Sequence, residues 1–182
     1  MLILASKSPR RIELLKLAGL DFKIFPAVGE EIVPDGLIPS EVVTFLAKQK
    51  ASELAKQFPD DVIIGADTVV ALGNTVMGKP SDKEDAYKML SVLSGKIHSV
   101  FTGVCIISGE KNITFFEETK VEFYPLSDEE IYRYIESGEP MDKAGAYGIQ
   151  EKGGLLVKKI EGDFFNVVGL PVARVVRELK NI

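Results

Sequence analysis

Short apolar runs alternate with amphipathic runs along this chain, and the alternation predicts an α/β protein. Strands are predicted at residues 2–5, 21–26, 61–72, 97–107, 113–123 and 155–160. Helices are predicted at about residues 9–18, 40–57, 81–93, 127–137 and 170–179. The strands at 97–107 and 113–123 are long and joined by a turn, so we expect them to pair antiparallel and the sheet to be mixed.

Serine residues mark most of the predicted helix starts. Ser8 precedes Pro9, which suits the first helical position, and Ser40 is a candidate N-cap. Ser81 and Ser127 each precede a glutamate by three residues, which is the spacing of a capping box.

The strand predicted at 61–72 carries the sequence Gly-Ala-Asp-Thr at 65–68, which we expect to interrupt it. No repeat, linker or low-complexity segment divides the chain. Residues 1–182 are therefore expected to form one domain, with two lobes and a groove between them.

Composition and charge narrow the classes of function. The chain has 182 residues, 46% apolar and 27% charged, and a net charge of −5, which disfavours a general nucleic-acid binder. Cys105 is the only cysteine, which excludes an internal disulfide, and His98 is the only histidine, so we interpret both as structural. The apolar start at 1–4 is too short for a signal peptide or a bilayer span, so a cytoplasmic location without membrane association is expected.

The sequence Ser-Lys-Ser-Pro-Arg-Arg at 6–11 places two arginines in the first turn of a predicted helix. A helix start has free N–H groups and a positive dipole end, and arginine binds phosphate oxygens with paired hydrogen bonds. A helix start built for stability alone would carry acidic residues. Phosphate binding by Ser8, Arg10 and Arg11 is therefore favoured over an ordinary solvated helix start.

Asp67 lies within an otherwise apolar strand, where an unpaired carboxylate is costly to bury. It should be paired, bind a metal or face a cleft, and a solvated acid at a strand edge is the alternative. Gly65 permits another backbone to approach closely. Either Glu30 or Glu31 could join Asp67 around Mg²⁺, although two solvated loop acids are the simpler interpretation of these residues alone.

Three more segments carry weaker signals. Lys48 and Lys50 are two residues apart on a predicted helix, so at most one of them should face a site. Lys79 lies in a Gly-Lys-Pro turn and can act as a point charge for phosphate. The loop at 142–150 combines charge, glycine and tyrosine and ends at Gln150, whose amide can bond a base or sugar, but a structural turn fits equally well.

Taken together and in order, these motifs resemble those of the Maf family of nucleoside triphosphate pyrophosphatases. The matching segments are residues 5–11, 48–51, 65–68, 79–80, 93–95 with His98, 142–150 and 168–171. They span nearly the whole chain, and the ordered set is much more specific than any one segment. The resemblance implies an α/β fold related to inosine triphosphatases, with a mixed twisted sheet, flanking helices and a deep cleft between two lobes.

The resemblance also implies roles for individual residues. Asp67 takes the position of the family's proton acceptor, while Arg10, Thr68 and Gln150 take positions linked to substrate choice. This combination looks like the branch that hydrolyses dTTP and UTP to the monophosphate and pyrophosphate. A divalent cation, Mg²⁺ or Mn²⁺, is implied as well, and we expect Asp67 and Glu31 to hold it.

The expected site is completed by phosphate-binding groups on Ser8, Arg11, Lys50 and Lys79. Two other functions stay open, a pyrophosphatase for 7-methyl-GTP or other non-standard purine nucleotides, and a non-catalytic nucleotide-binding regulator of cell division. Carboxylates near phosphate argue against simple binding. The resemblance and the frequency of twofold assemblies are compatible with a homodimer.

Overall fold

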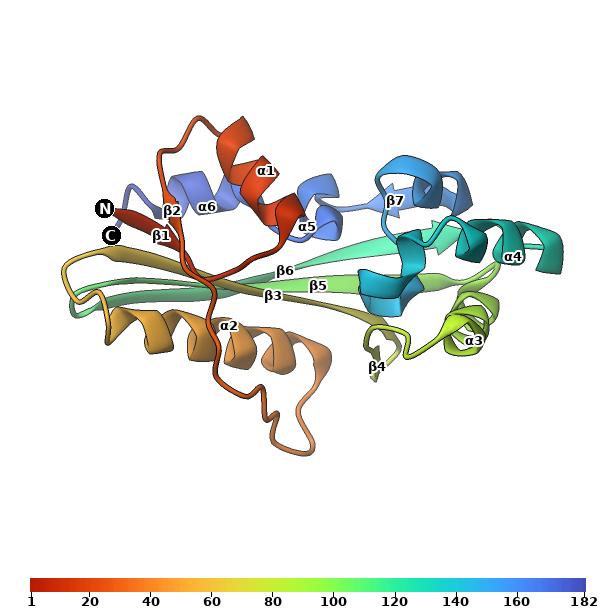
Figure 1. Cartoon of the computed structure of the whole chain (residues 1–182), viewed down its shortest axis with the longest axis horizontal. Helices are drawn as coiled ribbons and strands as arrows, with labels where there is room; N and C mark the ends of the chain where they lie inside the picture. Colours follow the sequence, from red (N-terminus) through yellow and green to blue (C-terminus); the bar gives the residue numbers. More distant parts are fainter.

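The computed structural model describes residues 1–182 and is built on one seven-stranded mixed sheet (Figure 1). The strands are β1 (Leu2–Leu4), β2 (Lys23–Ile24), β3 (Val62–Leu72), β4 (Thr75–Met77), β5 (Ile97–Ser108), β6 (Lys111–Phe123) and β7 (Val157–Glu161). Their order is β2-β1-β3-β5-β6-β7, and β4 pairs with β3 outside this order. β1 is parallel to β2 and β3, whereas all other pairs are antiparallel, which confirms the predicted mixed sheet.

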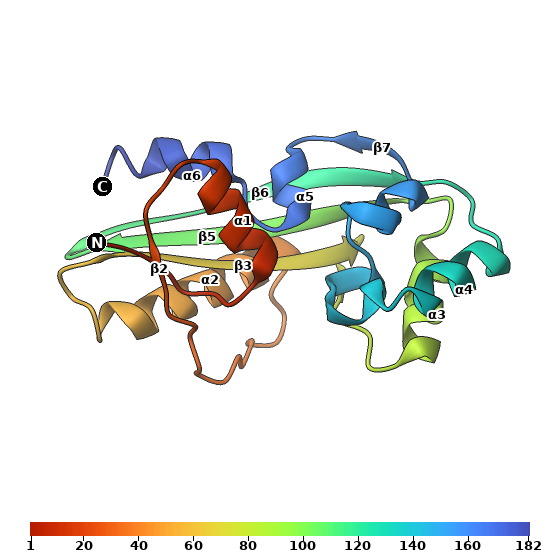
Figure 2. The ribbon, with the colours of Figure 1, turned by 45° about the horizontal axis from the view of Figure 1, so that its top comes forward.

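Six α-helices flank the sheet. They are α1 (Pro9–Leu17), α2 (Pro39–Ala55), α3 (Lys83–Leu93), α4 (Asp128–Glu136), α5 (Phe164–Val168) and α6 (Val172–Glu178). α1, α5 and α6 lie on one face and α2 on the other, while α3 and α4 pack together at the end far from both termini (Figures 1 and 2). None of these helices combines the length and the apolar character needed to cross a bilayer.

Separate apolar cores stabilise the two ends of the molecule. At the end with the termini, Leu15 of α1, Ile64 of β3 and Val175 of α6 belong to one fully buried cluster. At the other end, Leu90 of α3 and Ile131 of α4 pack into a second cluster. β3, β5 and β6 run through both ends, so the two lobes are parts of one continuous sheet (Figure 2).

One edge of β3 is free in the middle of the sheet. β1 pairs with β3 only as far as Ile64, and β4 begins to pair only at Val70. Residues 65–69 therefore pair with β5 alone and leave their other edge open. Successive strand residues point to opposite faces, so Asp67 and Thr68 present their side chains to different helices at this opening.

α2 packs very close to the sheet because glycines face it from two strands. A Cβ on Gly65 would collide with the carbonyl oxygen of Ala47, and one on Gly103 would collide with that of Val43. The two glycines therefore set the depth at which α2 lies, and the close backbone approach predicted at Gly65 is confirmed.

Three predictions about strands and loops need correction. β3 runs without interruption through residues 65–68, because β5 pairs with every residue of that stretch. The second predicted strand shrinks to the two residues of β2. The predicted loop at 140–154 contains 3₁₀ turns, at Glu139–Asp142, Ala144–Ala146 and Glu151–Leu156. α5 was not predicted, because five residues are too few to show a helical period.

The predicted helix caps are only partly correct. Ser127 makes both bonds of a capping box at the start of α4, as expected. Asp82 rather than Ser81 caps α3, because the helix begins at Lys83 and the Asp82 carboxylate accepts from the Asp85 N–H. α2 begins after Ile38, two residues before the predicted cap at Ser40.

Candidate active site

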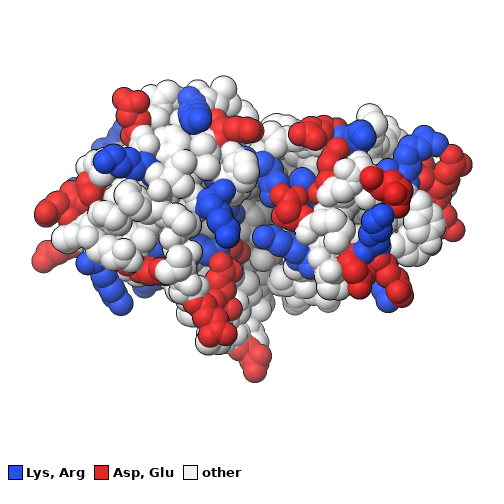
Figure 3. All heavy atoms as spheres, viewed as in Figure 1, with Lys and Arg blue, Asp and Glu red and all other residues white.

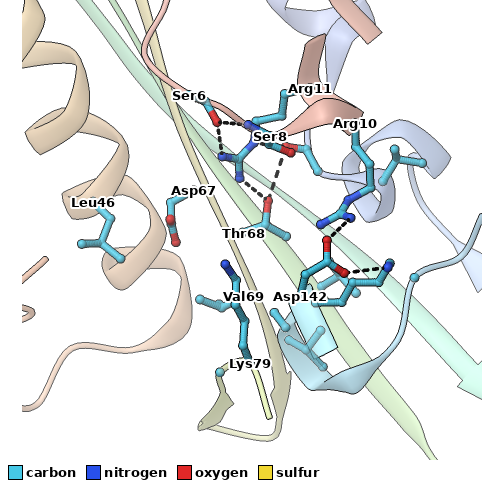
Figure 4. A pocket seen from close by; sticks show the side chains of 18 of the residues that line it. Ser6, Ser8, Arg10, Arg11, Leu46, Asp67, Thr68, Val69, Lys79 and Asp142 are labelled. Carbon is cyan, nitrogen blue, oxygen red and sulfur yellow. Dashed lines mark hydrogen bonds and ion pairs between the residues drawn. The ribbon is translucent and has the colours of Figure 1, made fainter. Parts of the chain in front are cut away.

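A cleft of about 850 Å³ lies between the two lobes, over the free edge of β3, and Figure 3 shows the hollow. This volume is within the range of small-molecule sites. All the residues proposed from the sequence line it, namely Ser8, Arg10, Arg11, Glu31, Lys50, Asp67, Thr68, Lys79 and Gln150. The region of α1 and α2 supplies one wall, β3 the floor, and the β4–α3 connection with the 3₁₀ turns the other wall (Figure 4). The predicted cleft is thus confirmed.

The cleft is positively charged although the chain is acidic. Six basic and three acidic side chains line it, a balance of +3 against −5 for the whole chain. The charged residues are Lys7, Arg10, Arg11, Lys50, Lys79, Lys143, Glu31, Asp67 and Asp142. Lysine and arginine side chains gather around the opening in Figure 3. A cleft lined mainly by one sign of charge attracts the opposite sign, so this one suits a polyanion.

Arg11 is held at the start of α1 by three oxygen acceptors. Its Nε donates to the carbonyl of Gly169 at 2.9 Å, and its two terminal nitrogens donate to Thr68 Oγ1 at 3.1 Å and Ser6 Oγ at 3.2 Å (Figure 4). A guanidinium has more N–H groups than these three bonds use, so two remain for a ligand. Burial lowers the pKa of Arg11 and the charge of Asp67 opposes this, but the group stays protonated.

Ser8, Lys79 and Gln150 bring further polar groups to the cleft. Ser8 precedes α1 as predicted, but its hydroxyl makes no capping bond and stays available. Lys79 reaches into the cavity in Figure 4 without an acidic partner. The half-buried Gln150 precedes the last 3₁₀ turn without capping it. The apolar part of the lining includes Val33, Val42, Leu46, Val76, Met77 and Ile149.

Lys50 lies between two carboxylates. Its Nζ is 2.6 Å from Asp67 Oδ1 and 2.9 Å from Glu31 Oε1. The side chains of Lys50 and Asp67 are only 15% and 13% exposed, so this pairing excludes most water, while Glu31 is half exposed. Lys48 is exposed on another side of α2, as the two-residue spacing predicted. Phosphate binding by Lys50 stays a prediction, because the lysine is engaged with these acids.

The Glu31–Lys50–Asp67 cluster has the chemistry of a site for a hard divalent cation. Its two carboxylates already converge on one positive charge, the ammonium of Lys50. Mg²⁺ commonly binds one or two protein carboxylates together with substrate phosphates. No group of three or more acidic, histidine or cysteine side chains is arranged to hold a metal by itself. Substrate phosphates and water would complete the coordination of a cation at this cluster.

One ion pair spans the cleft. Arg10 of α1 lies 3.3 Å from Asp142 Oδ2 in the opposite wall, and Asp142 Oδ1 accepts from Lys143 Nζ at 2.8 Å. Burial acts to raise the pKa of Asp142, but the hydrogen bond and charge of Lys143, with those of Arg10, lower it overall. An anion that binds Arg10 must compete with this carboxylate.

A buried histidine supports the wall that contains Tyr147. His98 Nε2 is 2.7 Å from the Tyr147 hydroxyl, and both rings pack edge-on against Phe123. His98 is 2% exposed, and burial lowers its pKa to about 4. The histidine is therefore neutral near pH 7 and lies behind the cleft, in agreement with its interpretation as structural.

We expect His98 to make the protein less stable in acid. Below pH 6.5 His98 of the unfolded chain takes up a proton, while the folded form stays neutral down to a pKa of about 4. Stability therefore falls as the pH drops through this window, by about 3 kcal/mol at roughly 1.4 kcal/mol per pH unit. Urea unfolding of the wild type and of His98→Gln at pH 7 and pH 4 measures the difference. Parallel pH dependence in the two proteins would contradict the expectation.

Sequence reasoning missed the partners of the predicted residues. Asp142 and Lys143 belong to a recognised motif, but nothing local indicates that Asp142 reaches α1. Thr102 is fully buried beneath Thr68, and its only signal is a hydroxyl inside the apolar strand β5. Gly169 takes part through its carbonyl, which the sequence does not reveal.

Comparisons with known proteins agree with these motifs. The family model described as Maf-like protein matches residues 1–182. A dTTP/UTP pyrophosphatase of Bacillus cereus is 52% identical over 179 residues, which cover 98% of this chain and 94% of that protein, and one of Bacillus anthracis matches equally. A crystal structure of a Vibrio cholerae protein aligns over 75% of this chain and 69% of that protein's chain. The sequence identity of 12% and the TM-score of 0.37 are too low for this similarity to inform the fold. The chain that brings these motifs together around one cleft thus belongs to the Maf-like protein family.

Proposed function

We propose that this protein hydrolyses dTTP and UTP to the nucleoside monophosphate and pyrophosphate, using Mg²⁺ or Mn²⁺. One observation carries the proposal, the meeting of an arginine-bearing helix start with the Glu31–Lys50–Asp67 cluster in a single positive cleft. Relatives that are named dTTP/UTP pyrophosphatases are 52% identical to this chain over 98% of its length. The cleft volume of about 850 Å³ accommodates a nucleoside triphosphate.

The basic wall supports binding of the triphosphate group. Arg11 keeps two N–H groups free, and Lys79 adds a charge that no protein carboxylate neutralises. Arg10 would exchange Asp142 for phosphate oxygens that carry more negative charge. The first-turn N–H groups of α1 complete this anion site. Held in this way, the phosphates lie along the floor beside Asp67. This binding orients the phosphoanhydride bond that is to be broken.

Asp67 is the residue proposed to activate water. Lys50 holds its Oδ1, which leaves Oδ2 to accept a proton from a water molecule. The water oxygen then bonds to the α-phosphorus as the bond to the bridging oxygen breaks, and pyrophosphate leaves. Glu31 and Asp67 would hold the divalent cation, which when bound would polarise the phosphates and lower the pKa of a bound water. Asp67 then either takes the proton of the water or chiefly fixes the metal.

A nucleotide panel with Mg²⁺ tests the function. We expect dTTP and UTP to give equal amounts of monophosphate and pyrophosphate, and EDTA to stop the reaction. Preferred turnover of 7-methyl-GTP or other non-standard purine nucleotides would show that dTTP and UTP are not the preferred substrates. Nucleotide binding without metal-dependent turnover would contradict the enzyme function and support a non-catalytic nucleotide-binding regulator.

Gln150→Ala should change the ranking of nucleotides. The Gln150 side chain is half-buried in the cleft, where its amide can both donate and accept hydrogen bonds at the edge of a base. Loss of that amide leaves base atoms unpaired, so we expect KM for dTTP and UTP to rise about tenfold, with smaller changes for poor substrates. The same panel measures this, with the thermal midpoint as a control for folding. An equal loss for every nucleotide would remove Gln150 from substrate selection.

Several finer assignments stay predictions. The roles of Arg10 and Thr68 in substrate choice rest on the family resemblance. A homodimer is compatible with that resemblance and is checked by light scattering. We propose the cytoplasm as the location, because nucleoside triphosphates are made and used there.

A further inference from the structure

A buried chain of polar groups continues from Arg11 into the centre of the sheet. Thr68 of β3 and Thr102 of β5 are direct cross-strand partners, and their hydroxyl oxygens are 2.9 Å apart. Thr102 is 0% exposed, and its hydroxyl donates to the backbone carbonyl of Asn166 in α5 at 3.0 Å. The proposed enzyme reaction makes no direct use of Thr102.

The direction of each hydrogen bond in this series of polar groups follows from the carbonyl oxygen at its inner end. A carbonyl oxygen only accepts, so the single hydroxyl hydrogen of Thr102 is used at Asn166. Thr68 must therefore donate to Thr102 Oγ1. The hydrogen of Thr68 is thereby directed away from Arg11, and the lone pairs of Thr68 Oγ1 are free to accept the N–H of Arg11.

Thr68 has one other acceptor within reach. The carbonyl oxygen of Gly169 lies 3.4 Å from Thr68 Oγ1, and the same carbonyl accepts the Nε of Arg11 at 2.9 Å. Without the hydroxyl of Thr102, the hydrogen of Thr68 would turn to this carbonyl, which has a second lone pair, and the Thr68 hydroxyl that accepts from Arg11 would rotate. Arg11 would then share the carbonyl of Gly169 and meet a re-oriented Thr68 hydroxyl, so the acceptors of two of its three bonds change together.

We propose that Thr102 is a positioning residue for Arg11, acting through Thr68 to aim the two free N–H groups of the guanidinium at the bound phosphates. This inference rests on the proposed function, because it takes the phosphates of a nucleotide as the ligand of Arg11. Thr102 itself touches neither the cleft nor the ligand.

Thr102→Val tests the proposal, because valine keeps the shape of threonine and removes the hydroxyl. Arginine contacts to phosphate persist through the reaction, so we expect KM for dTTP to rise about tenfold while kcat changes less than about threefold. The dissociation constant of non-hydrolysable α,β-methylene-dTTP should rise by the same factor. Thr102→Ser keeps the hydroxyl and should restore both values to within about twofold.

A matched control separates positioning from general support of the core. Thr119 of β6 is also 0% exposed and also donates to a backbone carbonyl, that of Asp163 at 2.9 Å. It accepts from Asn166 Nδ2 at 3.0 Å, so it bonds the same residue as Thr102, but it does not bond Thr68 or Arg11. Thr119→Val should lower stability without changing KM. Equal rises of KM in Thr119→Val and Thr102→Val would overturn the proposal.

A double-mutant cycle with Arg11→Ala gives the decisive readout. If Thr102 acts through Arg11, Thr102→Val should change analogue binding less than about twofold once Arg11 is absent. A full tenfold effect in the Arg11→Ala background would refute the inference. Should Thr102→Val not fold, Thr102→Ala serves in the same cycle.

The failures of the two proposals are distinguishable. Analogue binding is measured without turnover, so it decides the role of Thr102 even if dTTP is not hydrolysed. A wild type that binds the analogue and does not release pyrophosphate counts against the proposed function alone.

Discussion

Asp67→Asn should lower kcat for dTTP about 10³-fold while the protein stays folded, because loss of a general base costs on the order of 10²–10⁴ in rate. Asparagine has nearly the same shape, and its amide oxygen can still accept the Lys50 ammonium that lies 2.6 Å from Asp67 Oδ1. The amide cannot accept a proton from water, and it gives the divalent cation a neutral ligand in place of a charged one. Steady-state pyrophosphate release and a thermal melt measure both parts.

Asp61→Asn is the matched control for the loss of one carboxylate. Asp61 pairs with the N-terminal amine at 2.7 Å, outside the cleft lining. The change should leave kcat and KM for dTTP within about twofold of the wild type. Near-normal dTTP hydrolysis by Asp67→Asn would remove Asp67 from the mechanism, and equal losses in both variants would point to a nonspecific charge effect.

Gly65→Ala should destabilise the fold by about 3 kcal/mol, which is the upper end of the usual cost of overpacking, and should disrupt the Glu31–Lys50–Asp67 cluster. The added Cβ meets the backbone of α2 at Ala47 and Ala51, which cannot move aside as a flexible side chain can. α2 must shift away from β3, and Lys50, which lies between these two alanines on the same helix, then loses its short bond to Asp67. Urea unfolding and dTTP turnover measure the two effects.

Gly78→Ala is the control for glycine replacement in general. No atom lies within 4 Å of a Cβ at Gly78, and its backbone is not in the left-handed region. We expect its unfolding free energy to stay within about 0.5 kcal/mol of the wild type. A Gly65→Ala protein as stable as this control would show that α2 is not held at its depth by glycine.

The local sequence pattern was sufficient to predict elements with a long hydrophobic alternation or a clear helix-capping motif. The long alternating runs of β5 and β6 predicted an antiparallel pair, and the Ser127 capping box predicted the start of α4. The same reasoning failed for α5, which is only five residues long. It also predicted a break in β3, because polar letters at 65–68 do not reveal that β5 satisfies that backbone.

The candidate site divides in a similar way. Chemical type is local, so an arginine-rich helix start and an acid among apolar residues could be recognised along the chain, and their meeting in one cleft agrees with that interpretation. The pairings are not local, since Lys50 reaches Asp67 over 17 positions and Arg10 reaches Asp142 over 132.

Sequence alone therefore established which residues carry charge, hydroxyl and amide groups, and in which short motifs they occur. Their partners depend on three-dimensional packing, because β1 leaves the edge of β3 after Ile64 and α2 packs against Gly65. Hydrogen bonds act over about 3 Å. Only the folded chain brings atoms from distant segments within that range, so the contacts of Lys50 with Glu31 and Asp67 follow from packing and not from the local pattern of residues.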